Sequence, residues 1–299
     1  MLDYKGLEAL YAVQELQSFE AAAKKLHITQ SAISQRIKGL ETHYGEPILI
    51  RTLPYRPTEL GEQLIGHFKR ICLLEEDLES QIETTTMTPR ISIALNQDSL
   101  ETWFLDLIEE TDLFKNILLE IIADDQELTL GYLKNGLVSA CLSTSEREIL
   151  GGKVHFLGNM EYVLVASPAF VKNHFSKADP KECLRNAPAI KFNKNDQLHE
   201  RYLEKFFNLD GKELSYLIVP SVRGFKKFAL LGYGYGLIPR IDIVDELKKK
   251  QLLQLYDDKV WKIPLYWHYW AVDSKFYQKF NADIIHHAMN KLKHFQSLR

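Results

Sequence analysis

Apolar side chains recur every three or four positions over residues 1–45, which predicts short amphipathic helices. The last of these helices is expected over residues 30–43, with Ile33, Ile37 and Leu40 on one face. A β-like run and a proline-containing turn follow, so the first region is expected to be rich in short helices and to end in a small hairpin.

A long helix is then expected over residues 59–83, because apolar positions continue at helical spacing without an internal proline. Four of its apolar residues follow a seven-residue repeat or its intermediate position: Leu64, Ile71, Leu74 and Leu78. This spacing is typical of a coiled-coil seam, and a helix facing a protein core remains an equal alternative.

A polar connector at residues 84–89 marks a domain boundary, and buried strands alternate with helices beyond it. Strands are expected at residues 91–95, 117–123, 137–143, 162–166, 189–192, 217–219, 236–238 and 265–272. Helices are expected after Ser99 and Pro168 and at residues 127–134, 197–207, 225–231, 241–249 and 276–295. This alternation predicts two α/β lobes.

Composition excludes disordered, collagen-like and disulfide-dense chains. The chain has 299 residues, a net charge of −3 and 45% apolar residues, so it is expected to be an ordinary soluble globular protein. Its three cysteines show no close pair, which argues against a disulfide framework or a cysteine zinc site and fits a cytoplasmic protein. We expect no secretion signal and no membrane-spanning segment.

The charge is distributed unevenly along the chain. Residues 20–56 contain six basic and three acidic residues, a local charge of +3. Residues 71–90 contain five acidic residues and one basic residue, a local charge of −4. The small net charge therefore hides a basic patch in the first region, where a polyanion could bind.

The sequence lacks common enzyme signatures. The sequence has no nucleophile elbow, phosphate-binding loop or His-Glu-x-x-His motif, and the alternating glycines 232, 234 and 236 do not have dinucleotide-binding spacing. We expect no catalytic residues, no metal and no cofactor.

Residues 21–44 have the pattern of a helix-turn-helix, in which small residues let two helices cross closely and the second helix enters a DNA major groove. Polar side chains on the second helix suit base edges and phosphates, and basic residues nearby suit the DNA backbone. The candidate DNA-binding residues are Lys24, Gln30, Ser31, Ser34, Gln35 and Lys38. The alternative is a helical hairpin with a solvated polar face.

The run of residues 19–34, Phe-Glu-Ala-Ala-Ala-Lys-Lys-Leu-His-Ile-Thr-Gln-Ser-Ala-Ile-Ser, closely resembles the winged helix-turn-helix of LysR-type transcriptional regulators. The resemblance continues through Gly45, Arg51 and the Thr58-Glu59-x-Gly61 string, and the length and two-lobed pattern extend it to the whole chain. The strings at residues 34–36, 51–58, 94–103 and 265–268 resemble the ArgP/LysG (chromosome initiation inhibitor) branch of that family.

The resemblance implies a fold and a set of partners. It implies a winged helix-turn-helix domain followed by a two-lobed effector domain like a periplasmic binding protein, with Arg51 or Arg56 of the wing reaching phosphate or the minor groove. The implied domains are residues 1–58 for DNA, 59–89 for dimerisation, and 90–299 for the effector, with lobe I at about 90–165 and 270–299 and lobe II at about 166–269. The implied partners are inverted-repeat double-stranded DNA, further copies of the chain in a dimer or tetramer, and RNA polymerase.

The resemblance also implies a small-molecule effector, an amino acid such as lysine or arginine, that binds between the lobes and controls genes of amino-acid export or metabolism. Polar residues at expected strand ends and helix starts are the candidate ligands: Asn96, Asp98, Ser99, Asp124, Asp125, Ser143, Asn193, Ser221 and Arg223. Arg223 and Asn193 depart from the acidic residues expected in this branch, so a different amino acid or ligand pose stays open.

Two other classes of function remain. One is an architectural or replication-control protein that binds DNA without an effector, and the other is a solute-binding protein or enzyme in which the α/β lobes do the main work. Footprints that ignore every amino acid would favour the first, and failure to bind any duplex DNA would favour the second.

Overall fold

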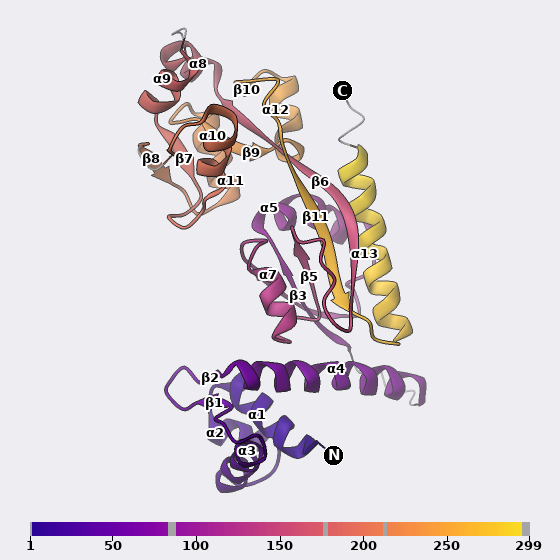
Figure 1. The fold of residues 1–299 in the computed structure, drawn as a ribbon. Coiled ribbons are helices and arrows are strands. Elements are labelled where there is room, and N and C mark those ends of the chain that lie inside the picture. Colours follow the sequence, from indigo (N-terminus) through magenta and orange to yellow (C-terminus); the bar gives the residue numbers. More distant parts are fainter. Residues whose placement is uncertain (1, 83–87, 176–178, 212–213, 295–299) are drawn as a thin grey trace. The chain divides into compact units, whose positions relative to one another are not determined.

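The computed structural model describes residues 2–82, 88–175, 179–211 and 214–294 (Figure 1). The chain forms two compact units. The first unit comprises Met1–Asn96, Ile108–Phe156 and Tyr266–His287, and the second comprises Gln97–Leu107, Leu157–Leu265 and Ala288–Arg299.

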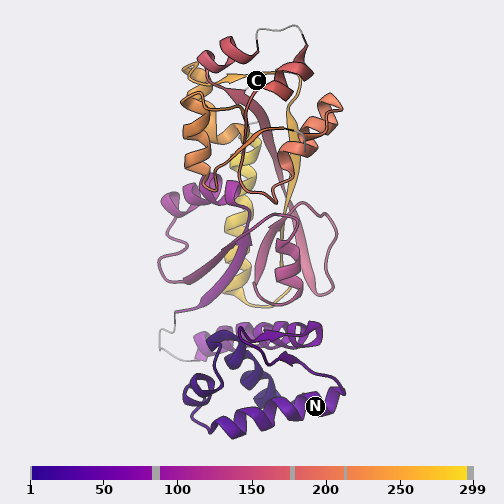
Figure 2. The same ribbon diagram turned by 90° about the vertical axis from the view of Figure 1, so that its left-hand side faces the viewer.

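The first unit begins with a bundle of helices and a small hairpin. Its elements are α1 (Tyr4–Leu16), α2 (Phe19–Lys25), α3 (Gln30–Tyr44), the antiparallel strands β1 (Leu49–Ile50) and β2 (Arg56–Pro57), and α4 (Glu59–Ile82). Helix α4 runs across the bundle, and the loop between β1 and β2 projects from it as a wing (Figures 1 and 2). This is the arrangement of a winged helix-turn-helix.

Local signals in the sequence explain where these helices begin and end. The side chain of Thr29 accepts a hydrogen bond from the backbone N–H of Ala32 and so caps α3. Helix α3 ends at Gly45, whose φ of 77° lies in the left-handed region that glycine adopts without strain. His27 also has a positive φ, 53°, and it makes the tight turn between α2 and α3.

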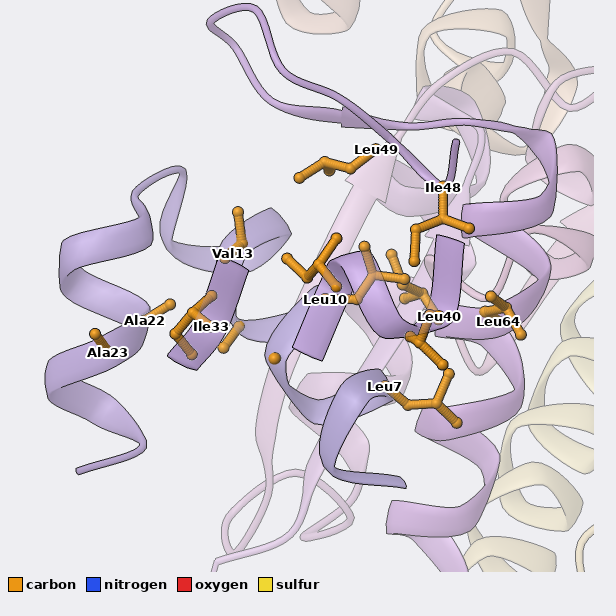
Figure 3. Close-up of a cluster of buried hydrophobic side chains, with 14 residues drawn as sticks. Leu7, Leu10, Val13, Ala22, Ala23, Ile33, Leu40, Ile48, Leu49 and Leu64 are labelled. Atoms are coloured by element: carbon orange, nitrogen blue, oxygen red, sulfur yellow. The ribbon is translucent and has the colours of Figure 1, made fainter. Parts of the chain in front are cut away.

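The apolar faces of α1, α2 and α3 meet in one core, which Figure 3 shows in close-up. Leu10, Ile33 and Ile37 are fully buried there. Leu64 of α4 is also buried in this core, whereas Leu74 is 45% exposed. The first position of the expected seam therefore stabilises the bundle. The side chain of Leu78 and residues 84–87 of the predicted connector lie outside the described residues.

Three parallel strands follow the helical bundle in the first unit. They are β3 (Arg90–Leu95), β4 (Leu118–Ala123) and β5 (Ala140–Ser143), and α7 (Thr129–Lys134) connects the last two. Their buried apolar residues make β3 and β5 nearly continuous hydrophobic runs, as parallel strands require. Strand β4 stands at the edge of its sheet.

The full sheet has the strand order β10-β6-β11-β5-β3-β4, with β9 also paired to β6. Its remaining strands are β6 (Gly152–Ala166), β9 (Gly236–Pro239), β10 (Leu253–Gln254) and β11 (Trp261–Trp270). The boundary between the two units falls within β6 and within β11.

The second unit has its own small parallel sheet of β7 (Ala189–Lys191) and β8 (Tyr216–Ile218). Its helical elements are α5 (Gln97–Ser99), α8 (Pro168–His174), α9 (Pro180–Asn186), α10 (Leu198–Phe207), α11 (Val222–Leu230), the 3-10 turn Arg240–Ile243 and α12 (Val244–Lys248). Val163, Ile190 and Phe225 belong to its core. The predicted fold class, a winged helix-turn-helix followed by a two-lobed α/β domain, is confirmed.

Several elements differ from the prediction in extent. Strand β6 begins at Gly152, ten residues before the predicted strand, and α9 was not predicted. The helix expected after Ser99 is a π-helical turn, Leu100–Phe104, followed by α6 (Leu105–Glu110), and the C-terminal helix is α13 (Lys275–His294). Thr102 has non-helical φ and ψ within the π-helical turn, because the backbone is kinked there.

Candidate nucleic-acid interface and sensor residues

Helix α3 presents a polar face to solvent. Gln30, Ser31, Gln35 and Lys38 are exposed, and Ser34 is half-buried. The opposite face of the helix is the apolar one in the core, so the helical period forces these polar side chains outward. Amide, hydroxyl and ammonium groups on one helix face are the donors and acceptors that read base edges and bind phosphates in a major groove.

Some of the basic side chains that are expected to bind DNA phosphates form ion pairs with glutamates in this structure. Lys24 lies 2.8 Å from Glu20, and both side chains are exposed. The guanidinium of Arg51 at the start of the wing lies 3.0 Å from Glu41 of α3. Glu41 is a residue that sequence reasoning did not select, and it ties the wing to α3.

In the first unit, the polar residues expected at strand ends are gathered at one edge of the parallel strands. Asn96 follows β3, Asp124 and Asp125 follow β4, and Ser143 ends β5. These strands are parallel neighbours, so their carboxyl ends lie side by side.

Each of these four residues has a local partner. Asn96 donates to the side chain of Gln126 at 2.7 Å, and Asp124 accepts a hydrogen bond from the hydroxyl of Tyr132. Asp125 and Ser143 accept from backbone N–H groups two residues further along. Local hydrogen bonds within the turns therefore position these side chains at the carboxyl edge of β3, β4 and β5.

In the second unit, Asp98 is the expected residue whose pKa departs most from its ordinary value. Its carboxylate accepts a hydrogen bond from the hydroxyl of Tyr162 at 2.6 Å, and its backbone oxygen accepts one from Thr102. Burial raises the pKa of Asp98 to about 6, the hydrogen bond from Tyr162 opposes this, and the carboxylates of Asp196 and Asp242 add to it. Burial of an acid among like charges disfavours its ionised form.

The other expected residues of the second unit have different settings. Ser99 is fully buried. Asn193 is exposed and accepts hydrogen bonds from the backbone N–H groups of Asn195 and Asp196, both at 2.8 Å. Ser221 caps α11 through the N–H of Gly224.

Asn193 and Ser221 follow the parallel strands β7 and β8, so they share the carboxyl edge of that small sheet. Arg223 is exposed in the first turn of α11. The structure thus groups the expected residues within each unit. One group lies at the carboxyl edge of β3, β4 and β5, a second lies at the carboxyl edge of β7 and β8, and Asp98 is partly buried in the second unit.

Sequence reasoning missed Tyr162 and Asp242, which act on Asp98. Tyr162 is separated from Asp98 by 64 residues, so no local pattern connects them. The one available signal was a tyrosine at the start of the strand predicted over residues 162–166, whose other residues are aliphatic.

Within the described ranges, no three histidine, cysteine, aspartate or glutamate residues are arranged to hold a metal ion. None of the helices in those ranges is both long enough and apolar enough to cross a membrane.

Comparison with known proteins identifies the first domain. The model of the family described as bacterial regulatory helix-turn-helix protein, lysR family, matches residues 4–62. The transcriptional regulator ArgP of Pseudomonas fluorescens strain Pf0-1 is 40% identical over 273 residues, which cover 90% of this chain and 91% of that protein. ArgP of Vibrio parahaemolyticus is 36% identical over 293 residues, 97% of this chain and 98% of that protein.

Two solved structures are similar over nearly the whole chain. ArgP from Mycobacterium tuberculosis is 32% identical, has a TM-score of 0.87, and is matched over 96% of this chain and 98% of its own. LysG from Corynebacterium glutamicum with bound effector arginine is 28% identical, has a TM-score of 0.80, and is matched over 97% of this chain and 99% of its own.

The relatives are DNA-binding transcriptional regulators, a class without enzymatic activity, and their similarity covers both the helix-turn-helix and the α/β domain. LysR-type regulators form oligomers and bind small-molecule effectors. The chain belongs to the LysR family of transcriptional regulators, in the branch that includes ArgP and LysG.

Proposed function

We propose that the chain is a cytoplasmic regulator that senses an amino acid with a cationic side chain, lysine or arginine, and controls genes of amino-acid export or metabolism. The observation that carries this proposal is the partly buried carboxyl of Asp98 in the second unit, which accepts a hydrogen bond from Tyr162 and whose pKa is raised by burial.

The carboxylate of Asp98 would be more stable with a cation bound beside it than without one. Because burial and the charges of Asp196 and Asp242 disfavour its ionised form, an ammonium or guanidinium group beside it would stabilise the carboxylate. A neutral or acidic ligand would give no such compensation. The arginine bound to LysG supports the same class of ligand for this chain.

Arg223 is the residue that argues for a different ligand, since its charge would repel a cationic side chain nearby. It is exposed on α11, where solvent weakens charge interactions. The other polar residues of the strand edges, taken within each unit, are proposed as contacts for the α-amino and α-carboxyl groups that all amino acids share. These are Asn96, Asp124, Asp125 and Ser143 in the first unit and Ser99, Asn193 and Ser221 in the second.

Isothermal titration with lysine, arginine, methionine and glutamate tests the proposal. We expect heat from the two basic amino acids and, at pH 6, release of protons as Asp98 ionises on binding, measured by repeating the titration in buffers of different ionisation enthalpy. At pH 8 the proton release is expected to vanish. No heat from the basic pair together with a clear response to methionine or glutamate would contradict the proposal.

We further propose that the exposed face of α3 reads an inverted-repeat operator in the major groove. Gln30, Ser31, Ser34 and Gln35 would contact base edges, and Lys24 and Lys38 would contact phosphates. Ser34→Arg or Gln35→Ala is expected to weaken binding to the operator more than binding to random duplex DNA. Equal losses on both DNAs would count against base readout by this face.

Self-association is proposed to use the part of α4 that lies beyond the core of the first domain. Leu74 is 45% exposed on this helix, and a second copy of α4 would cover it. Leu74→Lys is expected to weaken the dimer in sedimentation experiments, whereas Glu75→Lys on the same turn serves as the control. Dimers or tetramers would then meet RNA polymerase at the promoter.

A further inference from the structure

The tip of the wing is apolar, although the surface around it binds a polyanion. Strands β1 and β2 pair through Leu49 with Pro57 and Ile50 with Arg56, and residues 51–55 connect them. Leu53 at the tip is 73% exposed.

Both sides of the wing are fixed to the helices beneath it. The ring of Tyr55 packs edge-on against Phe19 with centroids 5.2 Å apart, and its backbone oxygen accepts a hydrogen bond from the side chain of Gln17 at 2.9 Å. On the other side, Arg51 is bound to Glu41 at 3.0 Å. The exposed leucine is therefore presented on an anchored loop whose base is held on two sides.

The charges of the wing flank the tip without including it. Arg51 precedes the tip, Arg56 follows it, and Thr52, Leu53 and Pro54 between them carry no charge. Arg56 suits a phosphate beside a groove, and Arg51 is held by Glu41, whereas a leucine side chain makes no favourable contact with a phosphate. The walls of a minor groove, which are lined by sugar C–H groups, suit an apolar side chain.

We infer that Leu53 enters the minor groove beside the major-groove site of α3 and distinguishes A·T from G·C base pairs there. In the minor groove a G·C pair adds the guanine 2-amino group to the groove floor, and A·T and T·A pairs lack it. Leu53 would clash with that amino group and leave it without a hydrogen-bond partner. Apolar side chains in the minor groove are a known device of DNA-binding proteins. The inference rests on DNA binding by the family and not on the identity of the effector.

Inosine separates the two grooves experimentally. An I·C pair presents the major groove of G·C but lacks the 2-amino group, so its minor groove is like that of A·T. An operator is first selected from random duplexes with the wild-type chain, and each flanking pair is then replaced by A·T, I·C or G·C. We expect A·T and I·C to bind equally and G·C to bind about fivefold or more weakly at the pair under the wing.

Leu53→Ala is expected to reduce this discrimination to less than about twofold while the chain still binds the operator. Leu150→Ala removes an even more exposed leucine, 99% accessible, from the loop between β5 and β6, and this control is expected to keep the full discrimination. Circular dichroism of both variants reports on the fold.

Three results would overturn the inference. If I·C binds as weakly as G·C, the flank is read from the major groove. If Leu53→Ala keeps the full preference for A·T, another residue reads the flank. If the wild-type chain binds no duplex at low salt, DNA binding itself fails, and that outcome is distinct from loss of the flank preference alone.

Discussion

Replacing Asp98 with asparagine tests whether its partly buried carboxyl destabilises the folded protein and is needed to bind the effector. Asparagine has nearly the same shape, and its side-chain oxygen can still accept the hydrogen bond that Tyr162 donates to Asp98. The substitution therefore removes the ionisable group with little change in packing. We expect the variant to be more stable than the wild type at pH 8 and to lose its response to lysine and arginine.

The pKa of Asp98 sets the size and the pH range of this effect. Burial raises the pKa from an ordinary value of 3.8 to about 6, so the folded state holds the proton more tightly than the unfolded chain does. Stability consequently falls as the pH rises from 3.8 to 6 and stays lower above that range. The difference of about two pKa units corresponds to about 3 kcal/mol at pH 8. The new amide N–H groups need partners, which reduces the expected gain to about 1–2 kcal/mol.

Differential scanning calorimetry of the full chain at pH 4 and pH 8 measures this gain. A stabilisation of 1–2 kcal/mol raises the midpoint of the affected transition by roughly 2–8 °C. Asp257→Asn, at an exposed site of the same unit, is the matched control and is expected to change little. An equal rise at both pH values, or a lower midpoint at pH 8, would refute the reasoning.

Three other tests address the packing and charge of the two units. Ile37→Ala, at a fully buried position of α3, is expected to cost about 2–5 kcal/mol in thermal unfolding and to abolish DNA binding. Lys191→Met is expected to lower the free energy of unfolding by about 3 kcal/mol in denaturant, because it leaves Glu200, 2.8 Å away, without its cationic partner. Adding Glu200→Gln should recover part of that loss. Burial lowers the pKa of His199 from 6.5 to about 3, so the folded state loses about 2 kcal/mol as the pH falls from 7 to 5, and His199→Phe should remove this acid sensitivity in hydrogen exchange.

The elements of the DNA-binding domain were predicted well because short-range chemistry determines them. A threonine that caps α3, a glycine that ends it and three apolar residues at helical spacing are all visible within 17 residues of sequence. The long helix was also predicted, but its heptad pattern did not distinguish a dimer seam from a core. Leu64 is buried in the core of its own domain, which only the packing of α1 against α4 could reveal.

Long-range pairing explains what was missed. The first part of β6 alternates irregularly between buried and exposed positions, and Gly158 within it has a φ of 144°. Such a segment is extended because its neighbours pair with it and not because of its own pattern. The raised pKa of Asp98 has the same origin, since Tyr162 and Asp242 reach it from distant parts of the sequence. The polar residues at the strand ends could be predicted from the sequence, but the residues that bind them or shift their pKa from distant parts of the chain could not.

The basic patch of the first domain is weaker than its sequence suggests, and this limits how a single copy can bind DNA. Of its six basic residues, Lys24, Lys25, Arg36 and Arg51 each lie within ion-pair distance of a glutamate. In the described part of the chain, Lys38 and Arg56 have no such carboxylate.

If only these two neutralise phosphates, log Kobs falls with log[salt] at a slope of about −2 for one domain and about −4 for a dimer. Titrations of operator DNA from 50 to 300 mM salt measure this slope, with Lys38→Gln as the variant that lowers it by about one for each bound domain. A wild-type slope near −8 or steeper would mean that the paired residues exchange their glutamates for phosphates, and it would contradict the premise that only Lys38 and Arg56 neutralise the DNA backbone. A shallow slope instead makes affinity depend on joining copies of the chain, because each domain alone releases too few counterions to hold an operator.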